Sequence, residues 1–476
     1  MSKRPKIALC FPNFAWQVSD ASFQWHMLPH SLCILAAMVR DVCEVDIIDA
    51  YKENMSRDGF AERLGSGKYD LVGISVLMDL FSRSGQMAVS LAKKTLPNCV
   101  TIMGGVYATM NPGDAMKNPD LDFVCIGEGE EAFPALIRHL FLGGERPREG
   151  FAYRNGEEVA VQARARFVQD LDNLPPPAYD LIDFSAYANW NQRKTIDDTG
   201  ALPCVTLFTS RGCPQSCCFC QAAKIAGHRV RAKSPEKVLE EMTFFKNVHG
   251  VRSIVFADEN LLAIRPRAEA IFKGMIERGL AMPWFSAVAS FNLDEELLAL
   301  MKESGCVCIN PAVESGSPRV LREIIHKPVN LTHTKRIVKA ANAMGIFTIA
   351  NFIVGFPGET WEEIRETLRF AEELEAGYVK IFAAIPLRHT ELWEVCEREN
   401  AFAPGFCSTE TSWNQGQIVS PHFDARELTL LRAYEWDRIN FSTPEKRARI
   451  AERMGVGAAE LDAIRRDTRK LALSRM

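Results

Sequence analysis

Three cysteines in one short segment are the residues of this chain best suited to hold a metal cluster. Cys213, Cys217 and Cys220 have the spacing CxxxCxxC, and they follow an apolar run from Cys204 to Thr209 that predicts a buried strand. Three thiolates in one loop can bind three irons of a cubane iron–sulfur cluster, whereas ferredoxin-type clusters use four cysteines. The spacing therefore predicts a cluster with one iron left open, as catalytic metal sites require.

Two other interpretations fit the same residues. A zinc site would need a fourth ligand, for which Cys218 and His228 are the nearest candidates, and a chain with 14 cysteines can also cluster three by chance. Cys218 directly follows a predicted ligand, so we expect its side chain to point elsewhere and to pack. The scattered histidines His326, His333 and His389 form no metal-ligand spacing.

The elements that must position the cysteine loop follow from alternating strand and helix signals over residues 201–390. The candidate strands are Val205–Thr209, Ser253–Ala257, Trp284–Val288, Val307–Asn310, Thr348–Val354 and Tyr378–Ala383. Six strands at this spacing predict a partial (β/α)6 barrel that is open on one side. Barrel active sites lie at the carboxyl ends of the strands, which is where the cysteine loop follows the first strand.

Residues 1–148 also alternate strand and helix signals. The apolar runs are Lys6–Phe11, Glu44–Asp49, Leu71–Val76, Val100–Met103 and Phe123–Ile126. This pattern predicts a Rossmann-like, doubly wound α/β domain with its ligand beyond the carboxyl ends of the strands. Glycines follow two of these strands, at Gly104-Gly105 and at Gly127 and Gly129. They are either tight turns or points where backbone approaches a ligand closely.

Two stretches lack this alternation. Residues 149–200 contain Leu174-Pro-Pro-Pro177, which cannot form a continuous helix, and we expect a linker there. Residues 391–476 predict a small helical carboxyl-terminal domain, because 424–440 and 444–475 carry amphipathic helical patterns. The helices could close one side of the barrel.

Composition limits the class of protein. The chain has 476 residues, 47% hydrophobic and 24% charged, which predicts two or three globular domains. A net charge of −4 gives no electrostatic reason to expect nucleic-acid binding. We find no apolar run long enough to span a membrane and no signal-peptide pattern after Met1. Fourteen cysteines then favour a reducing, cytoplasmic location.

The cysteine loop, with the aromatic Phe219 before its last cysteine, resembles the signature of the radical SAM superfamily. The flanking regions make the chain most similar to the cobalamin-binding members, over roughly residues 5 to 390. This resemblance implies a 4Fe–4S cluster on Cys213, Cys217 and Cys220, with S-adenosylmethionine chelated at the open iron. Cleavage of S-adenosylmethionine would then give a 5′-deoxyadenosyl radical that abstracts hydrogen from substrate.

The resemblance also implies which residues bind S-adenosylmethionine. The segments Phe256-Ala-Asp-Glu-Asn260, Ala312-Val-Glu-Ser-Gly-Ser317 and Asn351-Phe-Ile-Val-Gly-Phe-Pro-Gly-Glu359 look like family motifs at strand ends, although Ala312 stands where the family has glycine. The implied cofactor-binding residues are Phe219, Asp258, Asn260, Glu314, Ser315, Ile353 and Gly355. In the third segment Glu359 is expected to begin a helix.

The amino-terminal domain resembles the cobalamin-binding domain fused to many radical SAM enzymes. By this resemblance Gly104, Gly105, Gly127, Glu128 and Gly129 would lie against cobalamin. The DxHxxG motif, whose histidine ligates cobalt in mutases and methionine synthases, is missing after the first strand. His26 and His30 lie nearby but are expected to be helix-entry residues, so any cobalamin would be bound without a histidine on cobalt.

The function implied by the resemblance is a cobalamin-dependent radical SAM methyltransferase that methylates an unactivated carbon or phosphorus of a small-molecule substrate. One alternative is cyclisation, oxidation or rearrangement with the same cofactors, as in relatives of the anaerobic porphyrin cyclase. Another is a radical SAM enzyme whose amino-terminal domain no longer binds cobalamin. All three need an electron donor such as flavodoxin or ferredoxin. The sequence identifies neither the substrate nor a catalytic acid or base.

Overall fold

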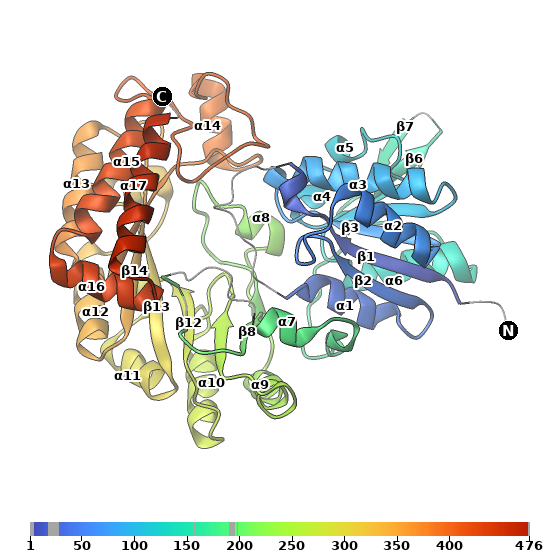
Figure 1. Cartoon of the computed structure of the whole chain (residues 1–476), viewed down its shortest axis with the longest axis horizontal. Helices are drawn as coiled ribbons and strands as arrows, with labels where there is room; N and C mark the ends of the chain where they lie inside the picture. Colours follow the sequence, from blue (N-terminus) through green and yellow to red (C-terminus); the bar gives the residue numbers. More distant parts are fainter. Residues whose placement is uncertain (1–3, 18–27, 157, 190–195, 198, 475–476) are drawn as a thin grey trace. The chain divides into compact units, whose positions relative to one another are not determined.

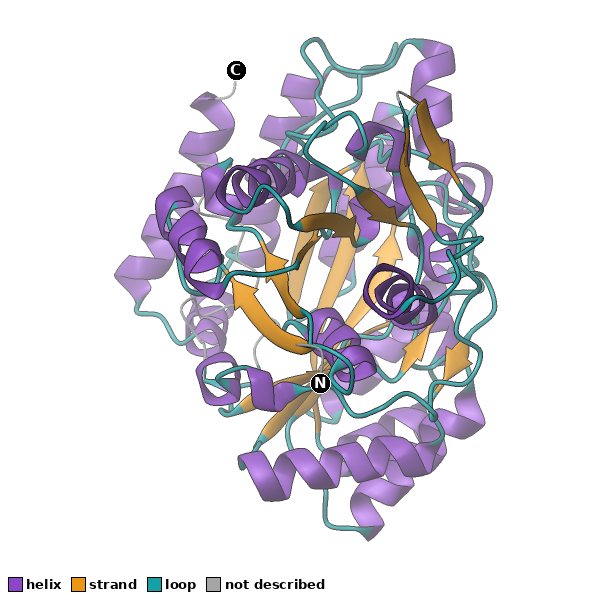
Figure 2. Cartoon of the chain, turned by 90° about the vertical axis from the view of Figure 1, so that its right-hand side faces the viewer, coloured by secondary structure: helices purple, strands orange, loops and turns teal. Residues whose placement is uncertain are grey.

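The computed structural model describes all residues except 1–3, 18–27, 157, 190–195, 198 and 475–476. The chain divides into two compact units, residues 1–187 and residues 188–476. Figure 2 shows the helices in purple and the strands in orange. The expected α/β fold class is confirmed in both units.

The first unit is built on a seven-stranded sheet in the order β2-β1-β3-β4-β5-β6-β7. Its strands are β1 (Lys6–Phe11), β2 (Glu44–Asp49), β3 (Leu71–Ser75), β4 (Val100–Gly104), β5 (Phe123–Cys125), β6 (Phe151–Asn155) and β7 (Glu158–Val161). Strands β1 to β5 are parallel, and the inner strands β1 and β3 are almost fully buried, as expected for apolar strands covered on both faces, whereas the edge strand β2 is partly exposed. The strand order reverses between β1 and β3, and a doubly wound sheet binds its ligand at that switch point.

Helices cover both faces of this sheet (Figure 1). They are α1 (His30–Val39), α2 (Arg57–Gly67), α3 (Ser82–Thr95), α4 (Val106–Met110), α5 (Pro112–Ala115), α6 (Gly129–Leu142) and α7 (Phe184–Ala188). Helix α1 packs on α6, and α2 packs on α3. The expectation that His30 enters a helix is confirmed, because α1 begins at that residue, whereas His26 lies outside the described residues.

Part of the stretch expected to be a linker joins the first sheet. Strands β6 and β7 form a hairpin that pairs antiparallel with β5. Its outer strand, β7, has only four residues and is largely exposed, so it lacks the long apolar run of a buried strand. The proline-rich part of the stretch follows the hairpin and leads to the short helix α7.

The second unit contains a six-stranded parallel sheet in the order β15-β14-β13-β12-β11-β8. Its strands are β8 (Cys204–Leu207), β11 (Ser253–Phe256), β12 (Trp284–Val288), β13 (Cys306–Glu314), β14 (Phe347–Val354) and β15 (Tyr378–Ala383). Consecutive strands are neighbours in space, so the sheet is the expected partial barrel. Strands β8 and β15 are its two edge strands.

Helices follow the strands on the outer side of this sheet (Figure 1). They are α9 (Pro235–His249), α10 (Arg265–Glu277), α11 (Glu295–Glu303), α12 (Leu331–Ala343) and α13 (Trp361–Glu373), and a π-helix, η5, spans Val320–Ile325. Trp284 on β12 stacks on Phe272 of α10 at 5.1 Å between ring centroids, and Phe352 on β14 meets Phe370 of α13. These contacts identify the outer face of the sheet, because side chains alternate between faces along a strand.

Four helices among the described residues form the carboxyl-terminal region. They are α14 (Glu391–Glu399), α15 (Ala425–Asn440), α16 (Pro444–Met454) and α17 (Ala458–Ser474), drawn in orange to red in Figure 1. One of them, α15, packs on the edge strand β15. The side chain of Asn440 donates to the carbonyl of Val379 and accepts from its amide, both at 2.8 Å. Strand β15 thereby gains hydrogen bonds that an open edge would lack. The helices do close one side of the partial barrel.

Candidate active site

The cysteine loop begins and ends at a small two-stranded ladder. Strand β9 (Ser210–Arg211) pairs antiparallel with β10 (Arg231–Ala232), so the ladder closes residues 212–230 into one loop. Within it lies the short helix α8 (Ala222–Ala226), and the amide of Cys213 donates to the carbonyl of Gly227 at 3.1 Å. The loop follows β8 at the carboxyl end of the sheet, where the sequence places it.

Cys213, Cys217 and Cys220 lie close enough to influence one another electrostatically. Cys220 is exposed and the other two are half-buried, so the thiols are accessible. Burial raises the pKa of Cys217 to about 11, and binding to iron, which requires the thiolate, must displace that proton. No three His, Cys, Asp or Glu side chains among the described residues form a single-ion site. A cubane cluster needs none, because its cysteines bind different irons.

Cys218 has a different environment from its three neighbours. Its side chain is buried in the apolar core beside β13, β14 and α14. Its amide donates to the carbonyl of Ile325 at 3.1 Å, and its carbonyl accepts from Leu392 at 2.9 Å. Cys218 therefore anchors the cysteine loop to the barrel, consistent with the expected packing role, and the other zinc candidate, His228, is exposed.

Asp258 fastens the first strand of the barrel to the cysteine loop. Its buried carboxylate accepts hydrogen bonds from the amide and hydroxyl of Thr209, at 2.6 and 2.5 Å, and from the hydroxyl of Ser210 at 2.7 Å. The buried Arg267 donates to the carbonyls of Thr209 and Lys233, at 2.9 and 2.7 Å. Both ends of the loop are thus held by buried charged side chains. In the structure Asp258 makes these positioning contacts, and its expected role towards S-adenosylmethionine stays a prediction.

Asn260 and Phe219 also lie beside this end of the sheet. Asn260 is buried, and its side-chain oxygen accepts a long hydrogen bond, 3.4 Å, from Asn292. The ring of Phe219 lies 6.0 Å from that of Phe356, which follows β14. Phe219 thus connects the cysteine loop to the segment that contains the predicted residues Ile353 and Gly355.

A buried ion pair stands next to the cysteines. The ammonium of Lys327 donates to the Glu314 carboxylate at 2.6 Å and to the carbonyl of Ala312 at 2.9 Å, and both charged side chains are less than 10% exposed. Burial lowers the pKa of Lys327, but Glu314 and the thiolates of Cys217 and Cys220 raise it more, so the net shift is upward. The lysine stays charged beside the predicted cluster ligands.

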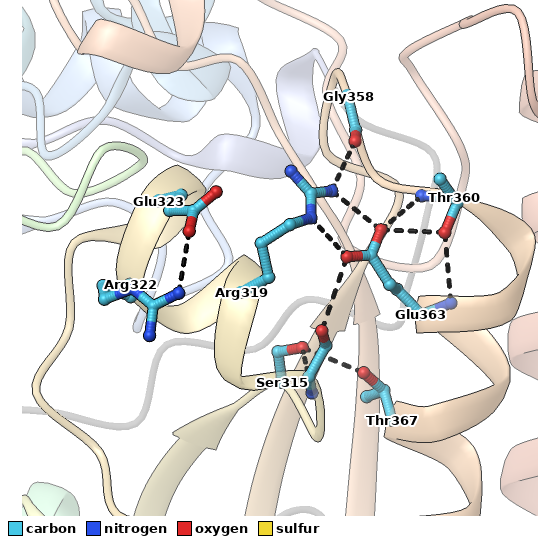
Figure 3. A network of polar contacts seen from close by, with 9 residues as sticks. Ser315, Arg319, Arg322, Glu323, Gly358, Thr360, Glu363 and Thr367 are labelled. Carbon is cyan, nitrogen blue, oxygen red and sulfur yellow. Dashed lines mark hydrogen bonds and ion pairs between the residues drawn. The ribbon is translucent and has the colours of Figure 1, made fainter.

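Glu314 and Ser315 are held in an unusual backbone arrangement. Glu314 has φ of +70°, a conformation that non-glycine residues adopt mainly where the surroundings enforce it. The hydroxyl of Ser315 bonds the hydroxyl of Thr367 at 2.9 Å and accepts from the amide of Ser317 at 3.1 Å. Figure 3 shows this contact with α13, and beside it Arg319 bound to Glu363. Ser315 is buried, and its contacts hold the turn that presents Glu314.

The segment after β14 is fixed by a buried carboxyl. Glu359 is fully buried, and one of its oxygens accepts from the amides of Gly355 and Phe356, at 2.6 and 3.0 Å. Burial raises the pKa of Glu359 to about 8. The expectation that Glu359 begins a helix is wrong, because α13 begins at Trp361 with Thr360 as its N-cap. Glu359 instead closes the turn before the helix.

Ile353 and Gly355 occupy this turn region. Ile353 is half-buried, with its side chain on the inner face of β14. Gly355 has φ of +91°, and a Cβ there would lie 2.4 Å from Leu428 of α15. The positive φ therefore favours glycine at this position, independently of any ligand.

The predicted glycines of the first unit lie at the carboxyl ends of β4 and β5. Gly105 has φ of +90°, and a Cβ would lie 2.4 Å from the carbonyl oxygen of Val76, so adjacent strand ends can approach this closely only with glycine. Gly104 has open space, with Cys125 at 3.9 Å. At Gly127 the side chain of Arg164 lies over the glycine, 2.9 Å from where a Cβ would stand.

The remaining predicted residues of this edge, Glu128 and Gly129, have structural roles within the first unit. The carboxylate of Glu128 accepts from the amide of Val168 at 2.7 Å, and Gly129 is the first residue of α6. His30 contacts the hydroxyl of Tyr179 through Nδ1 at 2.8 Å. Gly104 gives this edge open space, whereas Gly105 packs on Val76 and Arg164 lies over Gly127. The described histidine at the start of α1, His30, already contacts Tyr179.

Sequence reasoning missed Lys327 and Arg164 as candidate site residues. Lys327 lies in Ile325-His-Lys-Pro328 with no recognisable spacing to the cysteines, and only the fold brings it to them. A lysine 13 residues after a motif glutamate could have been flagged as its ion partner, but helical spacing does not predict the contact.

Comparison with known families agrees with this geometry. Residues 207–371 match the radical SAM superfamily, and residues 18–137 match the B12 binding domain. The first match contains the cysteine loop, Asp258, Glu314 and Gly355. The second match covers β2 to β5 of the first sheet.

Several characterised or named proteins are similar over most of this chain. A protein of Pyrococcus horikoshii named as an uncharacterised methyltransferase is 30% identical over 410 residues, 85% of each chain. Cytidylyl-2-hydroxyethylphosphonate methyltransferase of Streptomyces wedmorensis is 30% identical over 76% of this chain and 73% of its own. The anaerobic magnesium-protoporphyrin IX monomethyl ester cyclase of Rubrivivax gelatinosus is 26% identical over 77% of this chain and 66% of its own.

Solved structures share the fold. The cobalamin-dependent S-adenosylmethionine radical enzyme OxsB, with aqua-cobalamin bound, has a TM-score of 0.74 at 17% identity and covers 99% of this chain and 72% of its own. The radical S-adenosylmethionine methyltransferase TsrM from Kitasatospora setae has a TM-score of 0.67 at 18% identity, over 85% and 77%. A 4Fe–4S cluster, S-adenosylmethionine and cobalamin are accordingly the cofactors. The chain is an enzyme of the cobalamin-binding radical SAM family, in which an amino-terminal cobalamin-binding domain precedes a radical SAM domain.

Proposed function

We propose that this enzyme transfers a methyl group to an unactivated carbon, or to phosphorus, of a small-molecule biosynthetic substrate. The observation that carries the proposal is the 30% identity to two proteins named methyltransferases, which the chain matches over 85% and 73% of their lengths. When bound, the cluster and S-adenosylmethionine supply a hydrogen-abstracting radical, and the corrinoid supplies the methyl group. The protein supplies placement and charge.

Cys213, Cys217 and Cys220 are the cluster ligands in this proposal. Three thiolates bring negative charge into a partly buried site, and the ammonium of Lys327 offsets part of it at short range. Glu314 fixes that ammonium, and the Ser315–Thr367 contact fixes Glu314. Asp258 and Arg267 hold the ends of the cysteine loop, so the ligands keep their mutual positions. Phe219, Asn260, Ile353 and Gly355 line the same end of the barrel.

The amino-terminal unit binds cobalamin in this proposal. The corrin ring would lie against the backbone at Gly104, where there is open space, with Gly105, Gly127 and Gly129 at the same strand ends and Glu128 supporting the turn. His30 is occupied with Tyr179, so we propose that no histidine of the described residues ligates cobalt.

The enzyme also needs single electrons at low potential. We propose flavodoxin or ferredoxin as the donor, and the cytoplasm, where these donors and free thiols are maintained, as the location. No helix among the described residues is long and apolar enough to cross a membrane.

The second candidate keeps the cofactors but transfers no methyl group. Its support is the 26% identity to the porphyrin ester cyclase, whose length the chain covers to 66%. The two functions differ in their products. Methyl transfer consumes S-adenosylmethionine to S-adenosylhomocysteine and 5′-deoxyadenosine together, whereas the alternative yields only 5′-deoxyadenosine.

The test uses anaerobically reconstituted enzyme, cobalamin, a reductant and S-adenosylmethionine with a deuterated methyl group. The acceptor is supplied as small-molecule extract from a strain that lacks the gene. We expect both nucleoside products and one extract compound that gains the deuterated methyl group. Formation of 5′-deoxyadenosine with a changed extract compound and no deuterium would establish the second candidate.

A further inference from the structure

The inner face of the six-stranded sheet carries a band of small and polar residues. The strand registers pair Ala287 with Asn310, Ala312 with Asn351, and Asn351 with Lys380, across β12 to β15. Their neighbours along each strand face the outer helices, as the contacts of Trp284 and Phe352 show. Ala287 is exposed although it lies on a central strand. The inner face therefore borders accessible space.

An ion pair closes one end of this band. The ammonium of Lys380 donates to one Asp197 oxygen at 2.5 Å, and the amide of Asn310 donates to the other at 3.2 Å. Both charged side chains remain partly exposed to solvent, Lys380 to 25% and Asp197 to 29%. Partly exposed pairs of this kind are weak. A ligand that brings its own charges can therefore replace the contact.

The position of Asp197 is fixed by its neighbours rather than by the ion pair alone. Ile196 is buried in the barrel core, and the hydroxyl of Thr199 bonds that of Ser253, at the start of β11, at 2.7 Å. Asp197 therefore presents its carboxylate to the inner face at a defined place.

The side chain of Asn351 contains a polar atom that lacks a hydrogen-bond partner. Its side-chain oxygen is buried and has no hydrogen-bond partner in the described structure. An acceptor removed from water without a donor destabilises the protein, and such groups are rare in native structures. A ligand N–H donor next to Asn351 would satisfy this oxygen.

We propose that this band is the substrate-recognition site and that it binds the zwitterionic end of an α-amino acid. The substrate carboxylate binds Lys380 and Asn310, and its ammonium group binds Asp197 and the Asn351 oxygen. The site has one positive and one negative charge, so a zwitterion leaves neither unpaired, whereas a simple anion or cation would leave Asp197 or Lys380 without its partner. This inference rests on the proposed function, since it names the substrate class of that reaction.

The test measures binding of the common L-amino acids to the reconstituted enzyme with S-adenosylmethionine, by isothermal titration. For the tightest binder, the corresponding amino acid amide and N-acetyl derivative serve as probes that each lack one charge. We expect each derivative to bind at least tenfold more weakly. Lys380→Met and Asp197→Asn should each weaken the amino acid at least tenfold, and Lys335→Met, a change of an exposed lysine on α12, should not.

A second variant separates recognition from folding. Asn351→Leu removes the orphaned oxygen at similar volume, so it should raise the melting temperature of the ligand-free enzyme and at the same time abolish amino acid binding. If Asn351 had only a structural role, its substitution would not raise the melting temperature and abolish amino acid binding at the same time. The iron content and the S-adenosylmethionine affinity of all three inner-face variants should match those of the wild type.

Three results would overturn the inference. They are binding of no amino acid to the wild type, equal binding by wild type and Lys380→Met, and a lower melting temperature for Asn351→Leu. None of these results bears on the proposed methyl transfer. That proposal is tested separately, by measuring the nucleoside products formed with a cell extract. If methyl transfer is found and amino acids do not bind, only the substrate class is wrong.

Discussion

Glu359 should make the stability of the barrel unit fall as pH rises. Its carboxyl is fully buried and its pKa is raised by burial from 4.5 to about 8. Between these values the folded protein holds a proton that the unfolded chain has released. Stability contributed by the neutral carboxyl is therefore complete below pH 4.5 and is lost as pH rises towards 8.

The magnitude follows from the two pKa values. Between pH 5 and pH 8 the linkage relation gives a loss of about 3–4 kcal/mol in the free energy of unfolding. For a unit of roughly 290 residues this corresponds to about 5–7 °C in melting temperature, from the usual unfolding entropy per residue. Glu359→Gln removes the titration, and the glutamine oxygen can still accept from the amides of Gly355 and Phe356.

The assay is differential scanning calorimetry of the wild type and Glu359→Gln, from pH 5 to pH 8 under anaerobic conditions. We expect the difference between their melting temperatures to shift by about 5–7 °C in favour of the variant across this range. Glu362→Gln, a change of an exposed glutamate on α13, should follow the wild type at each pH. A constant difference between wild type and Glu359→Gln from pH 5 to pH 8 would refute the buried neutral carboxyl.

Three further predictions concern the cofactor sites. Reconstituted wild type should bind about four irons, Cys217→Ala should lose them and Cys218→Ala should keep them; the reverse pattern would show that the ligand assignment is wrong. Asp258→Asn should weaken hydrogen bonds worth about 1.5–3 kcal/mol each to a charged acceptor, so iron content should drop, and an unchanged iron content would count against the positioning role. Electron paramagnetic resonance of the cobalt(II) form should show no nitrogen splitting from imidazole, and splitting that vanishes in a His30 or His26 variant would contradict this.

The elements of both sheets could be predicted wherever burial on two faces forces a continuous apolar run. Lys6–Phe11, Trp284–Val288 and Tyr378–Ala383 have the boundaries expected from sequence, and so has the edge strand Glu44–Asp49, although it is only partly buried. The β6–β7 hairpin could not be predicted in this way, because an exposed edge strand needs no apolar run. Strand β13 continues past Asn310 to Glu314, where a polar ion pair replaces apolar packing.

The cysteine spacing located the candidate site because all three side chains belong to one loop. Lys327 could not be found from spacing, since it reaches Glu314 and the thiols only through the π-helix η5 and the turn after it. Contacts of this kind depend on how separate elements pack. Periodicity along one element contains no information about them.

The motif residues themselves show why similarity places a site more reliably than it assigns a role. Asp258, Ser315 and Gly355 match family positions, and each also contacts the protein itself, at Thr209, Thr367 and Leu428, while their predicted cofactor contacts stay predictions. Such residues shape the site through its protein scaffold, and their substitution should alter several ligands together. Neither Lys380 nor Asn351 was predicted as a site residue from the sequence. In the structure Lys380 forms a weak, partly exposed ion pair, and the side-chain oxygen of Asn351 is unpaired. A polar group whose contacts within the folded protein are weak or missing can bind a ligand instead. Only the tertiary structure identifies such groups.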